Sequence, residues 1–343
     1  MEFSSTAEGL RAFTEFLMKD HEVVAPVKKR GRFVFEIIDD ASEVVRDYPS
    51  TLLPPVRFIY PDNERLLSFD LNDITNASPI VDAPRRALLF VHPCDIHAIA
   101  VMDEVLSKEP ADANYLARRK AAIIIGYDCK TPCTENCLCF DKGCHKIDAG
   151  FDIMITELRG AKFFARAGSE AGLTALKNSG SFERASHSDK LSLVEAKEAK
   201  DKKFKRVLPK DVAVLSHELK ARSASTIWNT EGDKCVSCGA CNIVCPTCYC
   251  FDVADTVDVT TMKGERIRKW DSCQLSGFCK VASGENFRNT AASRLRHRVF
   301  KKEVYLKKRL GRSGCVGCGR CITHCIAKIS IKDIFTRVMN GEE

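Results

Sequence analysis

Two groups of four cysteines in the C-terminal third of the chain share one spacing, and this spacing is the strongest chemical signal in the sequence. In each group three cysteines recur at every third residue and a fourth follows after three intervening residues. Thiolates in this pattern are typical ligands of cubic [4Fe–4S] clusters. The groups are Cys235, Cys238, Cys241 and Cys245, followed by Cys315, Cys318, Cys321 and Cys325.

The assignment of ligands to clusters follows a crossed rule. In proteins with two such motifs, three cysteines of one motif surround one cube and the fourth reaches the other cube. Structural zinc sites also use Cys-x2-Cys pairs, but a zinc site gains nothing from the third cysteine of each motif. Pro246 follows Cys245, whereas Ile326 follows Cys325. We therefore predict one cluster on Cys235, Cys238, Cys241 and Cys325 and a second on Cys315, Cys318, Cys321 and Cys245.

The bulk composition is that of an intracellular protein with an ordinary core. A length of 343 residues allows about two domains. The N-terminus lacks a basic segment followed by an apolar stretch, so we expect no signal peptide, and no apolar run is long enough to span a bilayer. We expect a cytoplasmic location, where the eighteen cysteines stay reduced and serve metal binding or redox chemistry.

The first 178 residues alternate between patterns typical of strands and helices. A helical stretch, DIHAIAVMDEVL, separates the predicted strands 87–92 and 121–127, which indicates a parallel pair and an α/β domain with a mixed, partly parallel sheet. Residues 151–158 and 161–168 flank Arg159-Gly160 and predict a hairpin. Further strands are expected at 31–38, 56–60 and 65–70.

The rest of the chain divides at a change of composition. Residues 179–210 are rich in Ser, Lys and Glu and are expected to form a charged linker or exposed helix. Residues 211–343 hold both motifs, with helices expected at 211–228 and 293–311 and a largely helical insert between the motifs. The predicted fold class is α+β.

Six further cysteines converge on one region if the predicted parallel pair is correct. Cys94 and Cys129 follow neighbouring strands, and the carboxyl ends of parallel strands share one edge of the sheet. The loop after Cys129 adds four more thiols. The hypothesis is a third [4Fe–4S] cluster, and the alternatives are a zinc site or thiols without metal. The loop thiols are Cys133, Cys137, Cys139 and Cys144.

Several motifs together resemble one known family. CPTCYCFD (245–252), RKWDSC (268–273), GENFR (284–288), RLRHR (294–298) and HPCDIHA (92–98) are similar to the iron–sulfur (beta) subunit of cytoplasmic sulfhydrogenases and to the A subunit of anaerobic sulfite reductase. The resemblance covers nearly the whole chain. It implies an α-helical ferredoxin-like C-terminal domain with two clusters, and a third cluster held by Cys94, Cys129, Cys137 and Cys139.

The same resemblance implies an electron-transfer subunit of a larger complex. Such subunits relay single electrons between a flavoprotein that uses NAD(P)H and a catalytic subunit of hydrogenase, sulfur or sulfite reductase, or heterodisulfide reductase type. We find no motif for a catalytic nucleophile, nucleotide or flavin in this chain. The alternatives are a self-contained reductase of a small sulfur compound and a zinc-stabilised binding protein.

Two features stay unassigned by sequence. Eleven Lys or Arg against two acids lie between Lys280 and Arg312, which suggests either a solvated helical face or a docking surface for an acidic partner; nucleic acid is not expected, because interleaved aromatic residues are lacking. Four thiols outside the motifs either pack as small apolar groups or line a metal pocket. These are Cys248, Cys250, Cys273 and Cys279.

Overall fold

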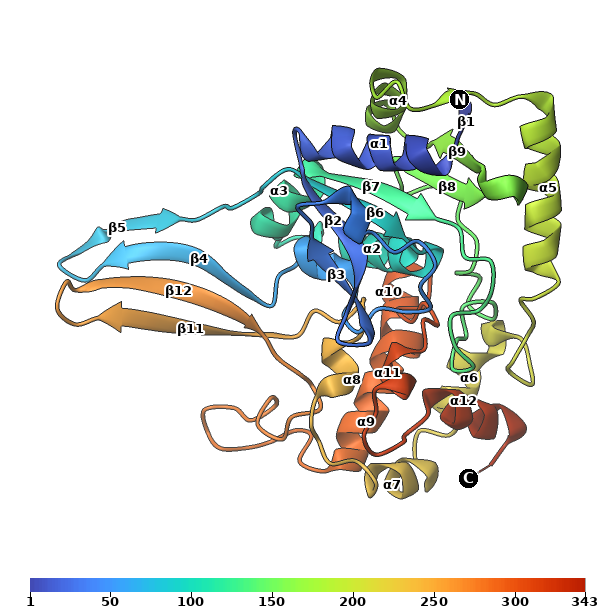
Figure 1. The fold of residues 1–343 in the computed structure, drawn as a ribbon. Helices are drawn as coiled ribbons and strands as arrows, with labels where there is room; N and C mark the ends of the chain where they lie inside the picture. Colours follow the sequence, from blue (N-terminus) through green and yellow to red (C-terminus); the bar gives the residue numbers. More distant parts are fainter. Residues whose placement is uncertain (343) are drawn as a thin grey trace.

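The computed structural model describes residues 1–342, apart from the side chain of Ile74, and its elements form two sheets and two groups of helices (Figure 1). The strands are β1 (Glu2–Ser5), β2 (Glu22–Lys29), β3 (Arg32–Ile37), β4 (Asn63–Asp70), β5 (Asp73–Pro79), β6 (Arg86–Val91), β7 (Ala122–Tyr127), β8 (Ile153–Glu157), β9 (Phe163–Ala167), β10 (Glu183–Arg184), β11 (Phe251–Asp258) and β12 (Lys263–Trp270). The α-helices are α1 (Ala7–Met18), α2 (Pro93–Leu106), α3 (Ala113–Ala121), α4 (Glu170–Asn178), α5 (His187–Asp201), α6 (Leu215–Ala221), α7 (Ile227–Gly232), α8 (Ala240–Ile243), α9 (Ala291–Phe300), α10 (Leu306–Leu310), α11 (Arg320–Thr323) and α12 (Ile331–Asn340).

The larger sheet confirms the predicted mixed, partly parallel arrangement. Its order is β10-β1-β9-β8-β7-β6-β2-β3. The four central strands β2, β6, β7 and β8 are parallel, while the outer pairs are antiparallel. The predicted unit β6-α2-β7 and the hairpin β8–β9 are both present. Helix α2 is the crossover connection that a parallel pair requires.

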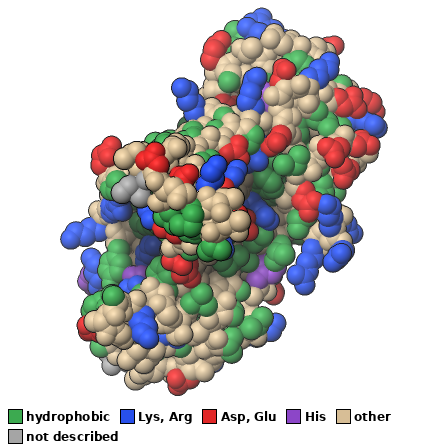
Figure 2. All heavy atoms as spheres, turned by 90° about the vertical axis from the view of Figure 1, so that its left-hand side faces the viewer, with side chains coloured by type: hydrophobic (Ala, Val, Ile, Leu, Met, Phe, Trp, Pro, Cys, Tyr) green, Lys and Arg blue, Asp and Glu red, His purple; other side chains and the backbone are tan. Residues whose placement is uncertain are grey.

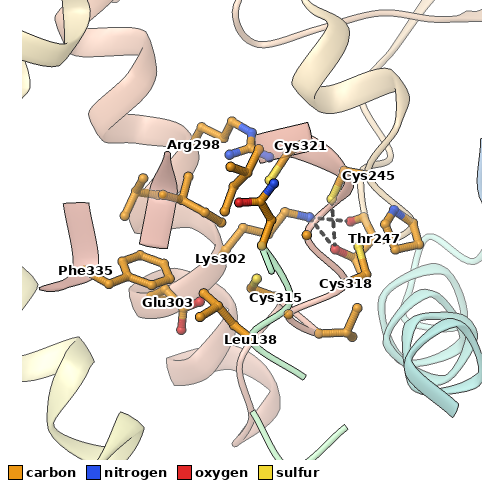
Figure 3. A pocket seen from close by; sticks show the side chains of 18 residues that line it. Leu138, Cys245, Thr247, Arg298, Lys302, Glu303, Cys315, Cys318, Cys321 and Phe335 are labelled. Carbon is orange, nitrogen blue, oxygen red and sulfur yellow. Dashed lines mark hydrogen bonds between the residues drawn. The ribbon is translucent and has the colours of Figure 1, made fainter. Parts of the chain in front are cut away.

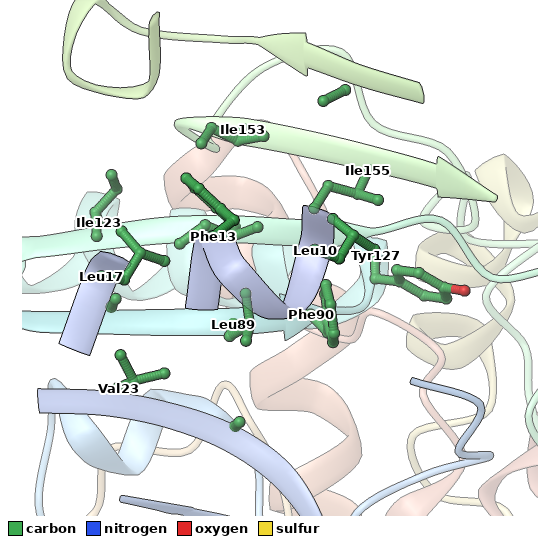
Figure 4. Packing of buried hydrophobic residues seen from close by; sticks show 14 of the residues in the cluster. Leu10, Phe13, Leu17, Val23, Leu89, Phe90, Ile123, Tyr127, Ile153 and Ile155 are labelled. Carbon is green, nitrogen blue, oxygen red and sulfur yellow. The ribbon is translucent and has the colours of Figure 1, made fainter. Parts of the chain in front are cut away.

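Alternating side chains of the central strands build a core on each face of this sheet. Leu89 and Ile123 face α1, where they pack with Phe13 (Figure 4). Leu88 and Ile124 face the opposite side and pack in the cluster that contains apolar residues of α2. Because both faces are covered, the strands are apolar throughout and their register is well determined.

Strand β6 ends in a β-bulge directly before His92 and Cys94. The register with β7 shifts between Leu89 and Val91, and Phe90 adopts a positive φ of 59°. The carbonyl oxygen of Phe90 accepts a hydrogen bond from the Tyr48 hydroxyl (2.6 Å). Left-handed backbone in an aromatic residue is strained and is held by such surrounding contacts. The bulge redirects the chain into His92 and Cys94.

The second sheet projects from the body of the molecule and contains the largest departure from the sequence prediction. Its order is β11-β12-β4-β5, so it joins segments from both halves of the chain. The insert between the cysteine motifs is therefore not largely helical, because residues 251–270 form a hairpin that pairs with β4. Phe251, Val253 and Val257 alternate along β11 and remain exposed. Figure 2 views this projecting side, where hydrophobic side chains lie among charged ones.

Two shorter segments also differ from the sequence prediction. Residues 56–60 are not a strand: the consecutive prolines Pro54 and Pro55 begin a short 3₁₀ helix, Pro55–Phe58. Residues 211–228 are not one helix but a 3₁₀ turn followed by α6 and the start of α7. Within residues 179–210, helix α5 begins with a capping box at Ser186, and β10 pairs with β1. No helix in the described part of the chain is long and apolar enough to cross a membrane.

The C-terminal helices pack around a separate apolar core. Trp228, Leu295, Val299 and Phe335 are buried in it, together with Leu138 from the cysteine-rich loop of the first half. The predicted helix at 293–311 is present as α9, a π-helical turn at Lys301–Tyr305, and α10, and Gly311 caps it in the left-handed conformation. The burial of Leu138 means that the two halves share this core.

Buried ion pairs join the same two halves. The Arg320 guanidinium donates two hydrogen bonds to the Asp95 carboxylate, at 2.6 and 2.7 Å, and both side chains are 2% exposed or less. Lys142 forms a second buried pair with Glu303 (2.7 Å). Removal of one partner from such a pair leaves an uncompensated charge in the interior.

We predict that Asp95→Asn lowers the free energy of unfolding by about 3–5 kcal/mol, because Arg320 would stay buried without its carboxylate. Urea unfolding followed by circular dichroism measures this loss. Asp148→Asn is the control, since the Asp148 side chain is fully exposed. Equal unfolding midpoints for the two variants would contradict the prediction.

Candidate metal centres

The two cysteine motifs fold into nearly identical loops. Gly239 and Gly319 adopt left-handed conformations with φ of 77° and 76°, and each precedes a helix of four residues, α8 or α11. Cys245 N–H donates to the carbonyl oxygen three residues before it (3.1 Å), and Cys325 N–H does the same (3.2 Å). Ile326 therefore stands where the other motif has proline without changing the local hydrogen bonding.

The first cavity lies between the end of the second motif and the loop of the first. Arg298 and Leu295 of α9 line it together with thiols from both motifs. Burial raises the pKa of the Cys241 thiol to about 12, so this site accepts a thiolate only with a compensating positive charge. The thiols that line the first cavity are Cys235, Cys238, Cys241, Cys321 and Cys325.

The second cavity lies beside the first, and Cys321 lines both (Figure 3). Cys245, Cys315 and Cys318 complete its thiols, with Arg298 and Lys302 on the same wall. The crossed rule predicts the same grouping, because Cys245 lies with the second motif and Cys325 lies with the first. Metal ligation by these residues stays a prediction.

The third cavity lies at the carboxyl edge of the large sheet. All six thiols that were expected to converge there line it, and His92 lies among them. Nδ1 of His92 is 3.6 Å from Cys133 Sγ, and the ring stacks on Tyr48 at 4.1 Å between centroids. Burial lowers the pKa of His92 to about 4, so the ring is neutral at pH 7. The six thiols are Cys94, Cys129, Cys133, Cys137, Cys139 and Cys144.

The second and third cavities adjoin through direct backbone contact. Leu138 N–H donates to the Gly317 carbonyl oxygen (2.7 Å), and Cys137 Sγ lies 3.6 Å from the Cys318 carbonyl oxygen. A Cβ atom at Gly317 would lie 2.4 Å from the Leu138 backbone. Glycine is therefore required for this approach, and Cys318 lines both cavities. The three cavities form one continuous series.

Two buried cations line the second cavity, and one of them also lines the first. Arg298 lines both cavities and donates one hydrogen bond to the Cys241 carbonyl oxygen (3.0 Å), while its Nε has no partner. Burial alone would lower the pKa of Arg298, but the charges of nearby thiolates, Cys241 first, raise it. Lys302 donates to the backbone oxygen (2.6 Å) and the hydroxyl (2.7 Å) of Thr247. Within residues 1–342, neither cation pairs with a carboxylate.

The presence of these two cations indicates that the cavities suit an anionic group. A buried cation without a counter-charge is unstable, so a site that holds two of them requires negative charge nearby. A cube held by four thiolates carries net negative charge and supplies it. The donor set of four thiols in each predicted ligand group fits such a group. Among the described residues, no three His, Cys, Asp or Glu side chains are arranged to hold a single metal ion.

For the Arg and His residues of 294–298 the sequence left two roles open, plain packing or positive charge placed near a cluster. Arg298 and Lys302 belong to the basic run that suggested an exposed face, yet both are buried. Their signal was their spacing of four residues on one helical face between two cysteine motifs, a face that also carries Leu295. Arg296, two positions before Arg298 on the same helix, is exposed.

The remaining four thiols lie outside the three cavities. Cys248 lies against Cys245, and Cys279 is buried. Asn242 Nδ2 donates to Cys273 Sγ (3.1 Å) and lies 3.8 Å from Cys250 Sγ. Hydrogen bonds, from Cys250 first and then from Asn242 and Gln274, lower the pKa of Cys273 to about 4. Cys250 and Cys273 therefore form a hydrogen-bonded pair of thiols beside Asn242.

Comparison with known proteins gave two matches. The sequence model of a family described as a 4Fe–4S dicluster domain matches residues 234–329, a range that contains both motifs. Over 334 residues the chain is 35% identical to sulfhydrogenase 2 subunit beta of Pyrococcus furiosus, and the alignment covers 96% of each chain. No solved structure matches.

We predict that Cys137→Ala removes about four iron atoms per chain, the content of one cube. Iron analysis of anaerobically purified protein measures the change. Cys279→Ala is the matched control, because Cys279 is buried but lines none of the three cavities. Unchanged iron in Cys137→Ala would rule out the third cluster.

Proposed function

The chain belongs to the family of the sulfhydrogenase beta subunit, and from this membership we propose that it is the iron–sulfur electron-transfer subunit of a multi-subunit redox complex. The observation that supports this proposal best is the continuous series of three thiol-lined cavities. A relay requires adjacent carriers, and Cys321 and Cys318 each line two cavities. A [4Fe–4S] cluster, when bound, supplies one-electron transfer.

The chain's own residues would hold three clusters. Cys235, Cys238, Cys241 and Cys325 are the proposed ligands of the first, and Cys315, Cys318, Cys321 and Cys245 those of the second. Cys94, Cys129, Cys137 and Cys139 are proposed for the third. The proposed organisation is an N-terminal α/β domain (1–178), a charged connecting segment (179–210) and a ferredoxin-like dicluster domain (211–343).

Cys238 is the proposed point of electron exchange with a partner. It is the one exposed thiol among the eighteen, all of which lie within the described residues. Val236 and Ile326 beside it are 61% and 69% exposed and line the same cavity. Exposed apolar side chains around a ligand provide a contact surface for another subunit. The proposed partners are a flavoprotein subunit that uses NAD(P)H and a catalytic subunit.

A second candidate function is favoured by the third cavity. Besides Cys318, which it shares with the second cavity, it holds six thiols, two more than one cube requires, and a neutral histidine. A self-contained reductase of a small sulfur compound would use these spare groups. Reduction of such a compound by the isolated chain, supplied only with an artificial electron donor, would favour this candidate over the relay.

Anaerobic purification with iron and sulfide analysis tests the proposed cofactors. We expect about eight of each per chain from two cubes, and about twelve if the third is present. Broad visible absorption that bleaches on reduction should accompany them. A colourless protein that contains zinc instead would contradict the proposal.

We predict that Val236→Asp weakens recovery of the partner subunits and lowers electron transfer through the complex at least about tenfold, because a carboxylate placed in an apolar contact costs on the order of 1.4 kcal/mol or more. Iron content should not change. Val194→Asp is the control, because Val194 lies on α5, is 54% exposed and lines none of the three cavities. Equal behaviour of the two variants would exclude a contact at Cys238.

A further inference from the structure

Helix α9 and the π-helical turn that follows it place permanent positive charge beside two of the three cavities. Arg298 lines the first and second cavities, whereas Lys302, one helical turn later, lines the second alone. Both side chains are about 5% exposed. Their contacts are few and neutral. Arg298 reaches the Cys241 carbonyl oxygen. Lys302 reaches Thr247, as Figure 3 shows.

The cations beside the third cavity are arranged differently. Arg320 is paired with Asp95, and Lys200 is paired with Asp128. Each cation there is neutralised by its own carboxylate, so the third cavity experiences little net positive charge from these buried neighbours. Unpaired buried charge is thus a property of the first and second cavities, rather than of every thiol-lined cavity in the chain.

The unpaired buried cations make it more favourable to add an electron to a group in the first or second cavity. A fixed buried cation stabilises the more negatively charged, reduced state of a nearby group, and weak screening in the interior keeps this effect large. Net charge and hydrogen bonding around the sulfurs are among the determinants of iron–sulfur reduction potentials. A cation that lines two cavities must act on both, and one that lines a single cavity must act mainly on that one.

We propose that the buried charges of Arg298 and Lys302 raise the reduction potentials of the two C-terminal clusters. Arg298 acts on both clusters, and Lys302 acts on the cluster of Cys245, Cys315, Cys318 and Cys321. This inference rests on the proposed function. By making reduction of the two C-terminal clusters more favourable, this helix would determine which clusters of the series hold the electrons. The neutralised cations beside the third cavity leave that end without the same stabilisation.

Potentiometric titration followed by EPR on the full-length chain tests the proposal. Arg298→Gln should lower both C-terminal midpoint potentials, each by at least a tenfold change in the equilibrium constant for reduction, or about 59 mV for a one-electron couple. Lys302→Gln should lower one of them by a similar amount and leave the other near its wild-type value. Arg298→Lys and Lys302→Arg keep the charge and should restore most of each shift.

Arg296→Gln is the matched control, because Arg296 lies on the same helix, is exposed, and donates to the Ser223 carbonyl oxygen (2.8 Å). Midpoints in Arg298→Gln equal to those of this control, with iron retained, would overturn the proposal. If Arg298→Gln loses iron, retention by Arg298→Lys supports a requirement for charge, and loss from both overturns it. Absence of any cluster signal in the wild-type chain would instead refute the proposed function itself.

Discussion

The buried ion pair between Arg320 and Asp95 is the contact on which the arrangement of the cysteines depends. Asp95 follows Cys94 in the first turn of α2, and Arg320 lies between Cys318 and Cys321. The pair therefore ties the third cavity to the second through residues next to proposed ligands in both. Its bidentate geometry fixes distance and orientation together. With Lys142–Glu303 and the shared packing of Leu138, it joins two halves that sequence composition alone would separate.

The same pair explains a difference in electrostatics along the series. Arg320 is a buried cation beside cysteines, as Arg298 is, yet its charge is cancelled by Asp95. A residue used to join the halves is thus nearly neutral toward the third cavity, whereas Arg298 and Lys302 make no ion pair among the described residues and act on the cavities they line. Arg320 thus joins the two halves, whereas Arg298 and Lys302 are the residues proposed to adjust the reduction potentials.

Sequence reasoning succeeded where a local pattern determines a local structure. The cysteine spacing identified two loops of equal geometry, and the apolar runs at 87–92 and 121–127 identified the parallel strands that bring Cys94 and Cys129 to one edge. It failed for the hairpin at 251–270, because Asp255 lies between Val253 and Val257 and interrupts the apolar alternation of the strand. It had no access to the pairing of Asp95 with Arg320, which are 225 positions apart. Burial of Arg298 and Lys302 depends on long-range packing of the same kind, whereas the basic sequence of their helix by itself indicates an exposed face.

The three thiol groups form one continuous series of adjacent cavities. EPR spectroscopy of the fully reduced chain tests this most directly, because neighbouring paramagnetic clusters interact magnetically. We expect broadened, spin-coupled signals in the wild-type chain, and a simpler spectrum when the third group is removed by Cys137→Ala. A wild-type spectrum that is the plain sum of isolated, non-interacting clusters would contradict the claim.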